Sequence, residues 1–228
     1  VISRFDLVLT YGGGDGVVRA YRAAGARDCV PIYNALDPTT HHPAPPTREY
    51  ACDLSLLANR LPDRESRVEQ FFIDVADGLP ARNFLLGGAG WESKTMPINI
   101  RRIGHVGTGQ HNTFFASGLV TLNVNRDSMA KYGFSPPTRV FEAAGAGACL
   151  ITDAWEGIDQ FLAPDSEVLV AADGDDVAGH LDMLDPVRAR AIARRARARV
   201  LAHHTYRHRA RQFHDLIEGV DIRTEAAE

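Results

Sequence analysis

Short apolar runs alternate along the chain with longer segments in which apolar residues recur three and four positions apart. The runs are short enough for buried strands, and the longer segments have the periodicity of helices that pack on one side. Strands are predicted at residues 5–10, 28–33, 52–58, 82–86, 119–124, 148–152 and 167–171. Helices are predicted up to about residue 25 and at 62–78, 110–117, 135–147, 156–162, 175–184 and 186–217. This alternation is typical of an α/β fold with a parallel sheet and right-handed crossovers.

A segment rich in proline and polar residues, 37–47, interrupts the pattern early in the chain. Such composition favours an extended, stiff connector, so we place a linker at 37–50 between a small unit, 1–36, and a large domain, 51–218. Residues 219–228 are expected to be a frayed tail. His41 and His42 lie in this linker without Asp, Cys or Glu at ligand spacing, which favours solvated side chains over a metal site.

Composition excludes several classes of protein. The 228 residues are 45% hydrophobic and 24% charged, with a net charge of −4, which does not favour nucleic-acid or anionic-membrane partners. No apolar run approaches the roughly 20 residues that span a bilayer. Cys29, Cys52 and Cys149 are scattered in apolar contexts, as expected for reduced thiols in a cytoplasmic protein.

The predicted helix 135–147 has two chemically different sides. At 100° per residue, Thr138, Arg139 and Glu142 fall on one arc, and Val140 and Phe141 fall on the opposite, apolar arc. A charged first turn beside a parallel sheet lies where α/β proteins bind ligands. The alternative is an exposed ion pair between Arg139 and Glu142, three residues apart.

The end of the predicted strand 119–124 is unusually polar. It carries Asn123, Asn125, Arg126 and Asp127, and the Ser135 loop follows soon after. A lined cleft explains this concentration of polar groups better than packing does.

Several motifs together resemble one known family. They are Leu122–Met129, Ser135–Gly147, Thr152–Asp159, Asp53–Arg60 and His204–Ala210. The chain resembles the CgeB-like (spore-maturation-type) glycosyltransferases, which are similar to the carboxy-terminal, nucleotide-sugar-binding half of GT-B glycosyltransferases. The resemblance implies a Rossmann-like GT-B carboxy-terminal domain with a remnant of the amino-terminal domain. The rest of that acceptor domain would be missing, and the fragment would be inactive alone.

The resemblance also implies a function: transfer of a sugar from a nucleotide-sugar donor to an unknown acceptor, with no metal or other cofactor. Glu142 would accept hydrogen bonds from the ribose, and Arg139 or Arg126 would face phosphate. The donor-binding residues expected in this way are Glu142, Arg139, Thr138, Arg126, Asn123, Ser135, Arg60, Gly88, Gly90 and Trp91.

Some of these roles have alternatives in the sequence itself. Arg60 and Arg64 flank a strand-to-helix turn where basic residues suit a pyrophosphate, but they could instead pair with neighbouring carboxylates on the surface. Trp91 could stack on a sugar ring or simply pack. His105 and Asp127 are the candidate catalytic groups.

One position departs from the resemblance. Many retaining GT-B enzymes carry a second glutamate eight positions before the ribose-binding one, and here Phe134 stands there. Two rival functions therefore stay open: a GT-B-like sugar-nucleotide epimerase and a noncatalytic nucleotide- or carbohydrate-binding module.

Overall fold

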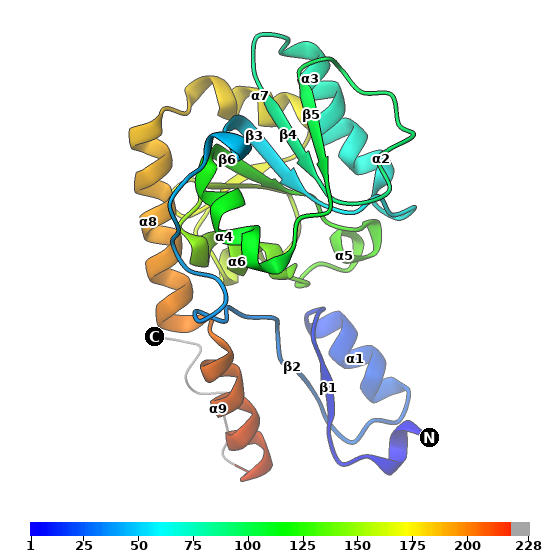
Figure 1. Ribbon diagram of the computed structural model, residues 1–228. Coiled ribbons are helices and arrows are strands. Elements are labelled where there is room, and N and C mark those ends of the chain that lie inside the picture. Colours follow the sequence, from blue (N-terminus) through cyan, green and yellow to red (C-terminus); the bar gives the residue numbers. More distant parts are fainter. Residues whose placement is uncertain (220–228) are drawn as a thin grey trace.

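The computed structural model describes residues 1–219 and is built around a parallel sheet of six strands (Figure 1). The strand order is β5-β4-β3-β6-β7-β8, and every neighbouring pair is parallel. The strands are β3 (Cys52–Leu57), β4 (Phe84–Gly87), β5 (Ile100–Gly104), β6 (Gly118–Asn123), β7 (Leu150–Asp153) and β8 (Leu169–Ala171). The α/β fold predicted from the alternation of apolar runs and helical segments is confirmed. Residues 220–228, most of the expected tail, lie outside the described part of the chain.

Helices cover both faces of this sheet, because the strands of a parallel sheet are buried on both sides. On one face, α2 (Glu65–Val68) continues through a π-helical turn (Glu69–Ile73) into α3 (Asp74–Gly78), and α7 (Gly174–Met183) lies beside them. On the other face lie α4 (Thr108–Ser117) and α6 (Thr138–Ala146), while α8 (Pro186–His203) contributes apolar residues to both faces.

Successive side chains along a strand point to opposite faces of the sheet, so the protein has one hydrophobic core on each face. In β4, Phe84 and Leu86 enter the core beneath α3 and α7, whereas Leu85 enters the core beneath α4 and α6. In α6, Val140 and Phe141 are fully buried in the second core, so the predicted apolar arc of this helix is confirmed.

A small βαβ unit precedes the large sheet and lies below it in Figure 1. It contains β1 (Val8–Thr10), α1 (Asp15–Ala23) and β2 (Cys29–Pro31), with the two strands parallel. A short 3-10 helix, Ile2–Arg4, comes before it, and another, Arg48–Tyr50, ends the connection to β3.

The chain crosses between the small unit and the large sheet twice. It leaves the small unit at Leu36, whose N–H donates to the carbonyl of His204 (2.8 Å), and it returns at Thr205. The second crossing leads into α9 (Tyr206–Ile217), where Arg209 Nε donates to the carbonyl of Tyr33 (3.1 Å).

Four predicted helices need correction, and β5 was not predicted. The helix 135–147 begins at Thr138. The helix predicted at 156–162 is only a 3-10 turn, Ile158–Gln160, and the helix 62–78 begins three residues late, at Glu65. The segment 186–217 is not one helix, because α8 ends at His203 and Thr205 caps α9 through a reciprocal pair of bonds with His208. A further short helix, α5 (Asp127–Tyr132), follows β6 where no helix was predicted. Within residues 1–219, none of the helices is both long and apolar enough to cross a membrane.

Candidate functional site

A polar cleft lies where β3, β4, β5 and β6 end and α6 begins. The carboxyl ends of parallel strands meet at one edge of a sheet, so the loops that follow them converge there. The cleft has two adjoining lobes that share Leu57, Ala58, Arg64, Arg126 and Arg139. The first lobe adds Asn123, Asn125 and Thr138 among others, and the second adds Gly88, His105, Thr108 and His111 among others.

Arginine is the dominant charge of the cleft. Arg139 donates to Glu142 Oε2 (2.7 Å), and Arg126 Nε lies 3.8 Å from Asp63. Arg64 has no ion pair within residues 1–219, and its Nε is buried without a hydrogen-bond partner. Burial and then the charge of Arg126 lower the pKa of Arg64. Asp63 and Asp153 act on Arg64 electrostatically but form no ion pair with it, so this partly buried cation makes the cleft attractive to an anion.

The amino end of α6 reinforces this attraction. Pro137 and Thr138 line the cleft, and no side chain caps the first N–H groups of the helix. Uncapped N–H groups and the helix dipole favour a negative ligand at such an end. The helix terminus and Arg64 therefore act on the same part of the cleft.

Glu142 lies one turn further along α6. The ion pair between Arg139 and Glu142 that the spacing left as an alternative is present, and the two side chains are 21% and 19% exposed. Arg139 also lies over the ring of Phe115, 5.3 Å from its centroid. Within the described residues Arg139 occupies only one carboxylate oxygen of Glu142, so Oε1 is left to accept from a ligand.

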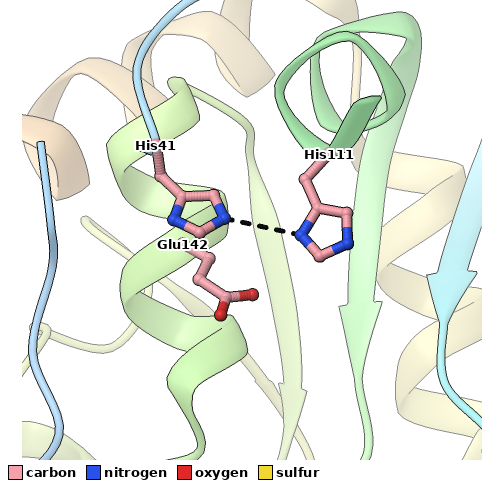
Figure 2. A group of neighbouring side chains, drawn as sticks. All are labelled: His41, His111 and Glu142. Carbon is pink, nitrogen blue, oxygen red and sulfur yellow. Dashed lines mark hydrogen bonds between the residues drawn. The ribbon is translucent and has the colours of Figure 1, made fainter. Parts of the chain in front are cut away.

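Two histidines from distant parts of the chain lie beside Glu142 (Figure 2). His41 comes from the 37–50 segment and His111 from α4, and His41 Nε2 lies 3.4 Å from His111 Nδ1. One ligand atom from each of His41, His111 and Glu142 lies within 4.8 Å of the other two. Burial is the largest cause that lowers the pKa of both histidines.

The expectation that both linker histidines are solvated is wrong for His41. Its side chain is buried, at 8% exposed, because the segment 37–50 packs against α4 and α6, whereas His42 is exposed. The argument that no carboxylate lies near these histidines is also wrong, because the fold supplies Glu142 from 101 positions away.

Several predicted site residues do line the cleft. Asn123 is buried, and its amide donates to Asn125 Oδ1 (3.2 Å) and Thr152 Oγ1 (3.0 Å), which fixes the strand end. Position 88 requires glycine for two reasons. Its φ is +127°, and a Cβ there would lie 2.1 Å from the Ala58 carbonyl oxygen. The predicted residues lining the cleft are Arg126, Arg139, Thr138, Asn123, Gly88 and His105.

Other predicted residues are placed elsewhere by their partners. Arg60 is held by Glu65 through two hydrogen bonds (2.8 and 2.7 Å), so it is Arg64 of the same turn that faces the cleft. Trp91 is only 2% exposed and donates to the Ala58 carbonyl (2.7 Å), which is the packed alternative. Gly90 lies outside the residues that line the cleft.

Ser135 and Asp127 also lie outside the lining. The hydroxyl of Ser135 is buried, accepts from the N–H of Gly13 (3.1 Å) and donates to the carbonyl of Gly133 (2.8 Å), so it joins the small unit to the large domain. Asp127 is exposed at the start of α5, where its backbone N–H donates to the Asp63 carbonyl (2.8 Å).

Phe134 has a structural role of its own. It adopts a φ of +42°, and its carbonyl accepts from the Gly13 N–H (2.8 Å). Its ring lies so close to Gly14 and Gly157 that a Cβ at either position would come within 2.6 Å of it. The position of the expected second glutamate is therefore occupied by an aromatic ring that packs between the small βαβ unit and the loop at Gly157.

Comparison with solved structures finds the same fold in glycosyltransferases. Sucrose-phosphate synthase from Thermosynechococcus elongatus superimposes with a TM-score of 0.74 at 15% identity, covering 96% of this chain and 59% of that one. HepE from Anabaena, solved with UDP-glucose, gives 0.71 at 12% identity, over 95% and 65% of the two chains. AviGT4, a glycosyltransferase of avilamycin A biosynthesis, gives 0.60 at 20% identity, over 94% and 66%. The chain thus spans about three fifths to two thirds of these proteins.

The fold is therefore that of GT-B carboxy-terminal domains, as the resemblance implied. The family model described as glycosyl transferase-like matches residues 64–215, which is most of the chain. The chain belongs to the glycosyl transferase-like family. A comparison with curated proteins finds no match.

Proposed function

We propose that this chain is the donor-binding part of a GT-B glycosyltransferase and that the cleft holds the nucleoside diphosphate of a nucleotide sugar. The observation that carries the proposal is Arg64, a guanidinium in the cleft without an ion pair in the described chain. A diphosphate supplies the missing negative charge, and charge-assisted hydrogen bonds to guanidinium groups are strong.

The remaining parts of the donor follow from this placement. The first N–H groups of α6 face the same diphosphate, and Arg126 adds a third source of positive charge. We assign the ribose hydroxyls to Glu142, whose Oε2 accepts a hydrogen bond from Arg139. Gly88 and His105 border the second lobe, which would receive the sugar.

The chemistry proposed for these residues is electrostatic. When a glycosidic bond to the donor breaks, negative charge develops on the departing nucleoside diphosphate, and fixed cations and helix N–H groups stabilise that charge. In this proposal Arg64, Arg126 and the amino end of α6 supply these charges, since all three line the cleft. Family membership and the UDP-glucose complex of the Anabaena neighbour support this assignment. The CgeB-like subtype is proposed on its sequence motifs alone.

Calorimetry with the nucleoside diphosphates of uridine, adenosine, guanosine and thymidine tests the proposal. We expect at least one of them to bind with one site per chain, and more tightly than its own monophosphate. Nucleosides without phosphate serve as the control for stacking alone. A chain that binds none of the four, or that binds monophosphate and diphosphate equally, would not be a donor-binding domain of this kind.

A further inference from the structure

The cluster of His41, His111 and Glu142 is not needed for the diphosphate contacts described above, yet it gathers three metal-binding side chains (Figure 2). They come from three separate elements: the 37–50 segment, α4 and α6. The members lie 70 and 31 positions apart in the sequence, so their meeting is a product of the fold.

The spacing of the two imidazole nitrogens is that of a long hydrogen bond, and it is also the spacing of two nitrogens that share one ion. His41 Nε2 and His111 Nδ1 are 3.4 Å apart, longer than the usual 2.9–3.0 Å of a hydrogen bond to nitrogen or oxygen. Two nitrogens bound to one tetrahedral zinc at 2.0–2.1 Å are separated by about 3.3 Å. The two nitrogens already have about this separation, and a carboxylate oxygen of Glu142 lies within 4.8 Å of a ligand nitrogen of each histidine.

The environment of His111 supports the same reading. Its second ring nitrogen, Nε2, lies 3.3 Å from the carbonyl oxygen of Val106. A proton on Nε2 that donates to this carbonyl leaves the lone pair of Nδ1 directed at His41. Metal-bound histidines are commonly oriented by such a backbone carbonyl.

We propose that His41, His111 and Glu142 form a binding site for a borderline divalent ion such as zinc. The geometry offers two imidazole nitrogens and one carboxylate oxygen of Glu142, and it leaves a fourth position for water or a ligand. Because Glu142 is also the proposed ribose acceptor, zinc and the donor nucleotide would compete for this carboxylate. Imidazole suits zinc, copper and nickel, whereas magnesium prefers oxygen ligands in octahedral geometry. Arg139, which holds the other oxygen of Glu142, opposes any cation, so binding depends on the imidazole bonds and excludes magnesium.

A zinc ion at this position would tie the 37–50 segment to α4 and α6. It binds the folded chain only, so it should raise the midpoint of thermal unfolding. At a free zinc concentration about 100 times the dissociation constant, we expect a rise of roughly 5–10 °C.

The test is calorimetric titration of the full chain with zinc chloride, without nucleotide, compared with magnesium chloride. We expect one zinc site that loses at least about tenfold in affinity in each of His41→Gln, His111→Gln and Glu142→Gln. His42→Gln is the matched control, because that neighbouring imidazole is exposed and lies outside the cluster. Cobalt(II) should give the intense visible absorption of a tetrahedral site in the wild type and not in His111→Gln.

Circular dichroism and the unfolding midpoint without metal show whether each variant folds. Zinc held by histidines of α8 and α9 would persist in every variant, so it is distinguished from the proposed site. Wild-type zinc affinity in folded His41→Gln and His111→Gln, or an equal loss in His42→Gln, would overturn the proposal. Because no nucleotide is present, either result leaves the donor site to be judged separately.

Discussion

Replacing Arg64 with glutamine separates ligand binding from stability. The change removes the cleft cation that has no ion pair in the described chain and leaves a shorter, neutral polar side chain. A hydrogen bond to a charged group contributes about 1.5–3 kcal/mol. If Arg64 makes one such bond to the diphosphate, Arg64→Gln should weaken nucleoside diphosphate binding roughly 10- to 150-fold.

The same substitution should not destabilise the chain without ligand. A partly buried guanidinium that forms no ion pair costs desolvation free energy, so its removal should leave the unfolding midpoint unchanged or higher. Arg64→Lys should bind nucleoside diphosphate more tightly than Arg64→Gln but less tightly than the wild type, since lysine keeps the positive charge but lacks the planar guanidinium group.

Arg60→Gln is the matched control, since Arg60 belongs to the same turn but is bound to Glu65. It should keep nucleotide affinity within about threefold of wild type, as expected for an ion pair outside the site. Isothermal calorimetry with diphosphate, monophosphate and nucleoside measures all three variants. Equal losses in Arg64→Gln and Arg60→Gln, or a loss that is as large for the nucleoside as for the diphosphate, would refute the assignment of Arg64.

Three further predictions concern the ribose, pH and the cleft backbone. Glu142→Gln and Glu142→Ala should each weaken diphosphate binding at least about tenfold, with little further loss for the 2′,3′-dideoxy nucleotide; wild-type affinity would reduce Glu142 to a structural ion pair. Burial lowers the pKa of His204 to about 3, so the unfolded chain binds more protons than the folded chain below pH 6.5. The free energy of unfolding should therefore fall as pH falls, by about 2 kcal/mol at pH 5. Chemical denaturation at several pH values checks this, and an unchanged slope in His204→Phe would contradict it. Gly88→Ala should cost about 1–3 kcal/mol because of its positive φ and its contact with Ala58, whereas Gly109→Ala, in open helix, should not destabilise; similar denaturation midpoints for the two would contradict the strain.

Much of the fold could be predicted because the spacing of apolar residues along the chain distinguishes strands from helices. The two-residue and 3.6-residue patterns located the strands of the main sheet except β5, and the helix period identified Val140 and Phe141 as the buried side of α6. The errors lie in short segments: Ile158–Gln160 and α5 are too brief for a periodic signal. The break at Thr205 depends on its reciprocal bonds with His208, which the helical pattern around it obscured.

The site was predictable in place but not in detail. The polar strand end at Asn123 and the charged first turn of α6 do meet in one cleft, as parallel topology requires. Sequence spacing could not show whether Arg60 or Arg64 faces the cleft. The answer depends on which of the two guanidinium groups is paired with Glu65. The sequence left open whether Trp91 stacks on a sugar or packs, and in the structure the carbonyl of Ala58 accepts from its indole N–H in the core.

The cluster at Glu142 had no sequence signal at all. His41 and His111 approach it only because the 37–50 segment packs over α4 and α6, and ligand spacing within the linker pointed away from any site. A search for histidines on segments that cross the strand-end face of the sheet would have selected His41 for attention.

The measurement that tests the central claim most directly is a crystal structure of this chain with the nucleoside diphosphate that binds best. The account predicts that the diphosphate lies in the cleft, within hydrogen-bond distance of Arg64 and of the first N–H groups of α6, with ribose hydroxyls at Glu142. A nucleotide bound elsewhere on the chain, or bound in the cleft with its phosphates turned away from Arg64, would contradict it.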